Sequence, residues 1–274
     1  MVYKKPKTIG IVGGMGPQAG IALYENIVNN TRATTDQQHL SVVLMAFPGD
    51  IDDRTLFLEG KALANPAYEI VKIIEKLSAS GAEVIGVACN TSHSPAIFDI
   101  ITSEVNKLKS KAILLNMPYE VCNYISAHHP GISKVGLMTT NGLYKSGLYK
   151  ILLQQRGYEV VIPDFTFQDR IIHRMIYDPD IGIKANKNTI TQKVKSFCDE
   201  ALSFFKENNA DAVILGCTEL SLVLKMNEVH GMQIIDSTKC LAKALIREAM
   251  AIDTGNIRQQ GLSDVNMPNG MAML

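Results

Sequence analysis

The sequence lacks the features that usually mark membrane, nucleic-acid-binding or disulfide-bonded proteins. Lys plus Arg equal Asp plus Glu at 27 each, so no excess charge attracts nucleic acid or an anionic membrane. No stretch reaches the roughly 18 uninterrupted apolar residues that a membrane helix needs. The five cysteines are odd in number and include no CxxC pair, which argues against a disulfide framework or a structural zinc site.

The start of the chain also lacks a convincing export signal. Met1 to Lys7 is basic, but the apolar segment after it is too short and too rich in glycine for a signal peptide. We therefore expect a cytoplasmic protein. The length of 274 residues suffices for two ordinary α/β domains or one large one.

Short apolar runs alternate with amphipathic stretches almost throughout the chain. Within Tyr68–Leu77 the apolar residues fall on one helical stripe. Runs of Val and Ile bounded by glycine are typical of parallel strands covered by helices. This alternation of strands and helices along the chain predicts an α/β fold with mostly parallel sheets flanked by helices. We predict strands at Thr8–Val12, Ser41–Phe47, Glu83–Ala88, Ala112–Leu115, Lys134–Thr139, Tyr158–Ile162, Asp211–Leu215 and Met232–Ile235.

The chain resembles itself at one nearly constant offset. Ile9–Gly16 lines up with Val135–Gly142, and Ala82–Cys89 lines up with Ala210–Cys217. This repeat predicts two pseudo-symmetric domains with an active site in the cleft between them. The predicted parts are residues 1–116 together with 232–251, which cross back to the first domain, residues 117–231 as the second domain, and residues 252–274 as a mobile tail.

Cys89 and Cys217 each follow directly on a predicted strand and precede a turn that contains threonine. Ligands bind at the carboxyl ends of strands in open α/β sheets, where backbone N–H groups can stabilise a thiolate. A single cysteine at such a place is more often a core residue. The repeat, however, makes these two equivalent, and two thiols across one cleft suit stereoinversion. We assign Cys122, Cys198 and Cys240, inside helical patterns, to the core.

Three segments closely resemble the signatures of a known group of enzymes. Ile9–Pro17, Ala88–Thr91 and Gly216–Glu219 are similar to the motifs of PLP-independent aspartate racemases and broad-specificity amino-acid racemases, in the aspartate/glutamate racemase superfamily. The resemblance runs from about Thr8 to Ala249. It implies an amino-acid racemase that needs no cofactor and no metal, acts on a small-molecule amino acid and usually forms a homodimer.

The same resemblance implies roles for individual residues. Cys89 and Cys217 would be the catalytic acid and base. Glu219 stands where glutamate racemases typically carry His, which favours the aspartate or broad-specificity branch. Acidic amino acids are therefore the leading substrate class.

A polar loop that contains Arg54 resembles the family's substrate-binding segment, although Asp52 stands where relatives commonly have Pro. Arg can clamp a carboxylate bidentately, with a salt bridge to a neighbouring Asp as the alternative. Lys184 falls where relatives carry a substrate-binding lysine. The other residues of the expected substrate lining are of types that also cap turns, so turn capping is the alternative role for them. That lining comprises Asn90, Thr91, Ser92, Thr139, Thr218 and Glu219.

Other functions stay open at this point. Hydantoin racemases and isomerases or decarboxylases of malonate-type or maleate-type acids share the expected architecture. Gly14–Ala19 matches a dinucleotide fingerprint with Asp36 about 20 residues on, as in an NAD-dependent dehydrogenase, but Pro17 interrupts the phosphate turn. A small-molecule binding protein is the non-enzyme alternative. His93 has no second ligand pair, so we do not expect it to bind a metal.

Overall fold

The computed structural model of the chain describes residues 5–108, 111–186 and 189–251, and these residues form two sheets. The first sheet has the strand order β2-β1-β3-β4 and the second β6-β5-β7-β9-β8. All neighbouring strands are parallel except β8 and β9. The strands are β1 (Ile9–Gly13), β2 (Val42–Ala46), β3 (Val84–Val87), β4 (Ile113–Leu115), β5 (Lys134–Thr139), β6 (Glu159–Val161), β7 (Ala212–Gly216), β8 (Glu228–Val229) and β9 (Met232–Asp236).

Helices occupy most of the chain between these strands. Within the described part of the chain, none is both long and apolar enough to cross a membrane. The α-helices are α1 (Pro17–Asn30), α2 (Arg54–Leu58), α3 (Ala67–Ala79), α4 (Pro95–Lys107), α5 (Met117–His128), α6 (Asn141–Ser146), α7 (Leu148–Gln154), α8 (Phe165–Phe167), α9 (Arg174–Tyr177), α10 (Gln192–Glu207) and α11 (Ser237–Met250). Shorter turns are η1 (Asp36–Gln38), η2 (Thr91–His93), the π-helical η3 (Gln168–His173) and η4 (Thr218–Leu222).

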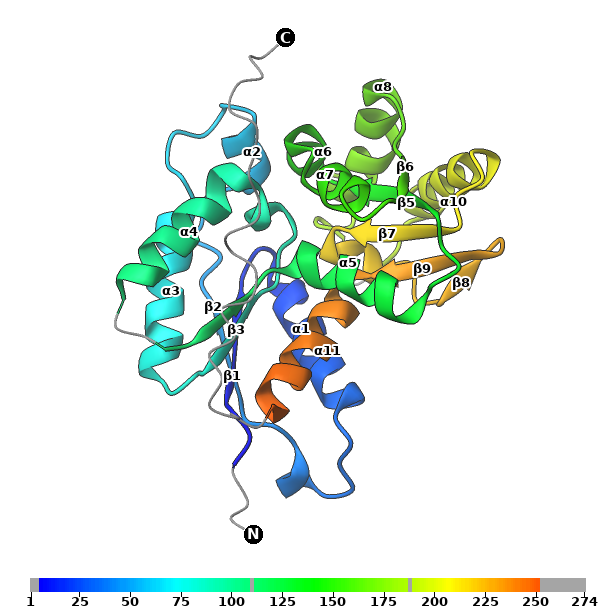
Figure 1. Cartoon of the computed structure of the whole chain (residues 1–274). Coiled ribbons are helices and arrows are strands. Elements are labelled where there is room, and N and C mark those ends of the chain that lie inside the picture. The colour runs from blue at the N-terminus through cyan, green and yellow to red at the C-terminus, as the bar shows by residue number, and fades with distance from the viewer. Residues whose placement is uncertain (1–4, 109–110, 187–188, 252–274) are drawn as a thin grey trace.

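Both faces of the first sheet are covered by helices. Helices α3 and α4 pack on one face, and α1 and α11 pack on the other (Figure 1). The sequence of α3 explains its orientation, because its residues Ile70, Ile73, Ile74 and Leu77 recur every three or four positions and are all buried.

The second sheet is covered in the same way. Helices α5 and α7 pack on one face, and α10 and η3 pack on the other. Parallel strands buried on both faces are rich in Val and Ile, as β7 is with its five buried residues. The prediction of mostly parallel sheets flanked by helices is confirmed.

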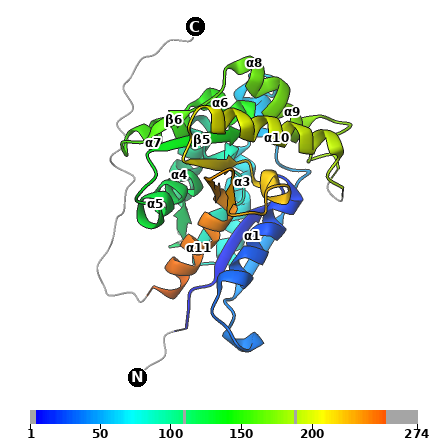
Figure 2. The same ribbon diagram turned by 90° about the vertical axis from the view of Figure 1, so that its right-hand side faces the viewer.

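The segment 232–251 joins the two halves. We expected all of it to cross back to the first domain, but its strand β9 pairs with β7 and so extends the second sheet. Only the helix α11 returns, and it lies beside α1 in both views (Figure 1, Figure 2). The domain limits stay predictions, and the tail 252–274 lies outside the described residues.

All eight strands predicted from the sequence are present, and each predicted end lies within one residue of the observed end. The short strand β8 (Glu228–Val229) was missed, since two residues cannot show an alternating pattern.

A close approach between β5 and α10 gives a test of this packing. A Cβ atom at Gly136 would lie 2.5 Å from the ring of Phe205, which is fully buried. Gly136→Ala should therefore lower the free energy of unfolding by about 1–3 kcal/mol, measured by urea denaturation. Gly131→Ala is the control, because nothing lies within 4 Å of a Cβ there. Equal stability of the two variants would contradict this packing.

Candidate active site

The carboxyl ends of strands from both sheets meet at one place. The Gly16 N–H after β1 donates to the Glu219 carboxylate after β7 at 3.2 Å. The hydroxyls of Thr91, after β3, and Thr140, after β5, are 3.0 Å apart. The turns that follow four strands thus contact one another, and two of these turns contain Cys89 and Cys217.

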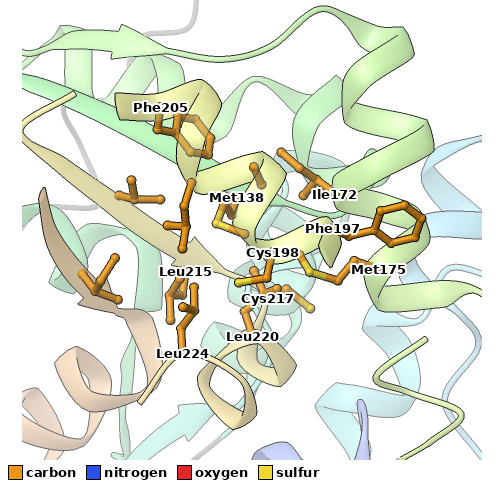
Figure 3. Packing of buried hydrophobic residues seen from close by; sticks show 14 of the residues in the cluster. Met138, Ile172, Met175, Phe197, Cys198, Phe205, Leu215, Cys217, Leu220 and Leu224 are labelled. Carbon is orange, nitrogen blue, oxygen red and sulfur yellow. The ribbon is translucent and has the colours of Figure 1, made fainter. Parts of the chain in front are cut away.

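Cys217 lies against a buried carboxylate. Its thiol donates to Oε2 of Glu219 at 3.0 Å, and only 6% of Cys217 is exposed. On its other side Cys217 belongs to the same apolar cluster as Met138, Met175 and Cys198 (Figure 3). Burial, together with the negative charge of Glu219, raises the pKa of the Cys217 thiol well above its usual value. The resting state of Cys217 is therefore the thiol.

Glu219 is kept ionised by the groups around it. Lys184 Nζ donates to Oε1 at 2.6 Å, and the Thr218 hydroxyl donates to Oε2 at 3.1 Å. Burial alone would raise the pKa of Glu219, but Lys184 outweighs it and the pKa is lowered. Burial likewise opposes the charge of Lys184, and Glu219 raises its pKa above the usual value. The pair is thus a buried ion pair whose carboxylate faces a thiol.

Cys89 lies in the opposite electrostatic setting. It is 5% exposed, and the guanidinium of Arg54 interacts with its side chain. Burial would lower the pKa of Arg54, but Cys89, Tyr177 and Asp53 outweigh burial and raise it. A positive charge thus faces the sulfur of Cys89, whereas a negative charge faces the sulfur of Cys217.

The local sequence explains why a charged Arg54 is buried. Asp53 caps helix α2 by accepting the N–H groups of Thr55 and Leu56, which fixes Arg54 as the first helical residue. Arg54 then donates to the carbonyls of Asp52 at 2.9 Å and Met15 at 3.3 Å. Its Nε is buried and has no hydrogen-bond partner among the described residues, so one charged donor is left for a ligand.

One peptide group contacts both cysteine environments. The carbonyl of Met15 accepts from Arg54, and the N–H of Gly16 donates to Glu219. The turn after β1 therefore lies between the cation beside Cys89 and the carboxylate beside Cys217. A pocket of about 170 Å³ opens at this turn, and residues of both halves line it. They are Gly16, Pro17, Gln18, Ile183, Lys184, Glu219 and Leu222.

A larger hollow of about 730 Å³ lies at the other end of the first sheet. It is lined by residues such as Glu75 and Glu83, and it contains none of the predicted site residues. The convergence of polar side chains therefore locates the site, and the size of a hollow does not.

The other predicted lining residues are engaged within the fold. Asn90 bonds Tyr149 and Ser237, and the Ser92 hydroxyl donates to the sulfur of Met15 at 3.3 Å. Thr139 ends β5, and its carbonyl accepts from Gln168. The structure brings Arg54 to Cys89, and it brings Lys184, Thr218 and Glu219 to Cys217.

Sequence reasoning missed Tyr177. Its hydroxyl donates to Asp53 at 3.0 Å, and Lys184 Nζ lies 5.2 Å from the centre of its ring. Tyr177 thus connects the loop of Arg54 to the ion pair beside Cys217. The sequence around Tyr177 gave no signal for this, because an aromatic residue in a helical pattern is typical of a core.

His93 contacts the backbone of Cys89. A ring nitrogen of His93 hydrogen-bonds the Cys89 carbonyl at 2.8 Å, and burial lowers the pKa of His93 to about 4. The imidazole is therefore neutral at physiological pH. Among the described residues, no group of three or more His, Cys, Asp or Glu side chains could hold a metal ion.

The chain is similar to known proteins in both sequence and fold. A family model described as Asp/Glu/Hydantoin racemase matches residues 12–245. The aspartate racemase of Picrophilus torridus has a TM-score of 0.72 and 30% sequence identity, covering 89% of this chain and 94% of that one. An aspartate racemase homologue from Pyrococcus horikoshii OT3 shares the fold, with a TM-score of 0.65, 24% identity, and coverage of 89% and 100%.

A glutamate racemase from Aquifex aeolicus (strain VF5) is 24% identical over 180 residues. The matched part is 62% of this chain and 59% of that protein, which is less than two thirds of its length.

The charges around Cys217 predict opposite effects for two substitutions. Glu219→Gln removes the negative charge and should lower the pKa of Cys217, whereas Lys184→Met removes the positive charge and should raise it. Iodoacetamide alkylation of Cys217, followed by site-resolved mass spectrometry across pH, should shift to lower pH in the first variant and to higher pH in the second. Cys198, whose pKa burial raises to about 12, is the internal control. Shifts in the same direction would contradict the assignment.

Proposed function

The chain belongs to the Asp/Glu/hydantoin racemase family, and we propose that it racemises an amino acid without a cofactor, with Cys89 and Cys217 as the two proton-transfer groups. The family match confirms the resemblance found in the sequence. The observation that carries the proposal is the pair of strand-end cysteines with opposite charges beside them. The guanidinium beside Cys89 would offset the negative charge of a sulfur that acts as the base, and the carboxylate beside Cys217 favours a protonated sulfur that donates a proton.

In the proposed reaction one sulfur is a thiolate and the other a thiol. The thiolate of Cys89 takes the proton from Cα, and the thiol of Cys217 gives a proton to the opposite face of the same carbon. One C–H bond breaks and another forms, so the product is the other enantiomer and the cysteines exchange protonation states. The reverse reaction uses Cys217 as the base. Glu219, which accepts the Cys217 thiol proton in a hydrogen bond, steadies the thiol form.

The difficult step is the negative charge that develops at Cα beside a carboxylate. Hydrogen-bond donors that are already aimed at that carboxylate offset this cost. We propose that the free Nε–H of Arg54 is one of them, because it is buried and lacks a partner within the described residues. Arg54 would then serve both the substrate carboxylate and the sulfur of Cys89.

We propose acidic amino acids as the leading substrate class. Lys184 lines the pocket of about 170 Å³ and uses one of its three N–H donors on Glu219. The other donors leave capacity for a side-chain carboxylate. Thr91, Ser92, Thr139 and Thr218 remain proposed lining residues, and the homodimeric state and the cytoplasmic location stay predictions.

Replacing either thiol tests the chemistry. Cys89→Ala and Cys217→Ala should each abolish racemisation, with circular dichroism spectra like the wild type, because each variant keeps only one of the two proton-transfer groups. Cys122→Ala is the control, since Cys122 lies in the core away from both thiols. A Cys217→Ala variant that racemises near the wild-type rate would refute the two-thiol reaction.

Incubation of the wild type with single enantiomers in deuterated water, without added cofactor, tests the substrate class. We expect α-deuterium to enter aspartate or glutamate faster than alanine or methionine. Exchange in hydantoins but in no amino acid would assign the protein to the other activity in the family's description. Binding of amino acids without exchange of the α-proton would contradict the proposal that the protein is a racemase.

Arg54 has a prediction of its own. Because its guanidinium faces Cys89, Arg54→Ala should lower kcat/KM for all substrates, and a lost charge-assisted hydrogen bond of about 1.5–3 kcal/mol corresponds to roughly one to two orders of magnitude. The ratio of aspartate to alanine turnover should stay within about threefold of the wild type. A selective loss of aspartate turnover would instead make Arg54 the clamp of a side-chain carboxylate.

A further inference from the structure

Three buried side chains form a continuous hydrogen-bond chain that the reaction above does not use. The Tyr149 hydroxyl donates to Oδ1 of Asn90 at 2.7 Å, and Nδ2 of Asn90 donates to the Ser237 hydroxyl at 2.8 Å. Ser237 in turn donates to the carbonyl of Leu215 at 2.7 Å. We call Tyr149, Asn90 and Ser237 the Asn90 relay.

The relay joins four separate elements of the fold. Tyr149 lies on α7, Asn90 follows β3, Ser237 begins α11, and Leu215 is in β7. Tyr149 and Asn90 are 2% exposed and Ser237 is fully buried, so water does not compete for these groups. A buried polar group that loses its partner is costly, which gives the relay a defined geometry.

Two hydrogen bonds fix the orientation of the Asn90 amide. Its oxygen accepts from one half of the molecule, and its nitrogen donates to the helix that returns from the second sheet to the first. Burial raises the pKa of Tyr149 well above its usual value, so its hydroxyl keeps the proton that it donates. Rotation of the amide by half a turn would bring its oxygen against the Ser237 hydroxyl, whose single proton is already donated to the Leu215 carbonyl, and would break that hydrogen bond.

The relay contains or contacts a residue close to each of the two cysteines. Asn90 directly follows Cys89, and Leu215 precedes Cys217 by two residues. The relay therefore ties the backbone at one thiol to the strand that carries the other, through two hydrogen bonds from Asn90 to the Leu215 carbonyl.

We propose that Tyr149 and Ser237 are positioning residues that hold Cys89 in register with Cys217, so that both sulfurs flank the same carbon atom. This inference rests on the proposed two-thiol racemisation. Proton transfer depends steeply on the placement of the reacting groups, and a displacement of about 1 Å can cost about a hundredfold in rate.

The test uses Tyr149→Phe and Ser237→Ala, which each remove one hydroxyl and keep most of the packing. We expect kcat to fall about tenfold to a hundredfold in each variant, with KM within about twofold of the wild type. Because both act on the same Asn90 amide, the loss in the double variant should be clearly smaller than the product of the two single losses. Independent, multiplicative losses or an unchanged kcat would overturn the relay.

Matched controls separate positioning from general stability. Tyr144→Phe removes a tyrosine hydroxyl that donates to the Pro163 carbonyl at 2.9 Å, and Ser146→Ala removes a serine hydroxyl that donates to the Leu143 carbonyl at 2.7 Å. These variants should keep the wild-type kcat even where thermal denaturation shows a comparable loss of stability. A fall in kcat that follows stability across all four variants would make the relay purely structural.

A second measurement needs no turnover. Loss of the relay should loosen the turn of Cys89, which is 5% exposed, and speed its alkylation by iodoacetamide several-fold in Tyr149→Phe but not in Tyr144→Phe. Unchanged Cys89 alkylation in Tyr149→Phe would overturn the relay. If the wild type exchanges no α-proton but the alkylation rates change as expected, the proposed function fails, and the relay is shown only to hold the turn of Cys89.

Discussion

The site depends on the compensation of one buried carboxylate. Glu219 is 5% exposed, and it stays ionised because Lys184, Cys217, Thr218 and the Gly16 N–H all donate to it. A buried charge without such partners would cost several kcal/mol. Gly16 comes from the first half of the chain and the other donors from the second, so the assembly of the two halves adds a fourth hydrogen bond to the carboxylate.

The two halves differ in the charge beside their cysteines, although their sequences repeat. Both contain a strand that ends in cysteine, yet Cys89 faces the guanidinium of Arg54 whereas Cys217 faces Glu219. An asymmetric pair suits a reaction in which one sulfur accepts a proton while the other donates one. The turn at Met15 and Gly16 contacts both settings, so the charge on one side is held at a fixed place relative to the other.

Much of the fold could be predicted because its signals are local. Apolar runs located all eight predicted strands, and the repeat singled out Cys89 and Cys217 among five cysteines. Arg54 and Glu219 were expected to contact the substrate, and their contacts with the two thiols could not be predicted, because these contacts depend on tertiary packing. Tyr149 and Ser237 gave no signal either, because a tyrosine in an apolar helix and a serine after Asp236 are typical of a core and of a helix start.

The most direct test of the central claim follows the isotope in both enantiomers during the first few per cent of reaction in deuterated water. Two opposed thiols predict that the newly formed enantiomer carries deuterium at Cα from the outset, while the remaining starting enantiomer stays almost free of it. A single base that serves both faces would instead return its proton to either side. Equal deuterium in both enantiomers, or protium retained in the product, would contradict the account.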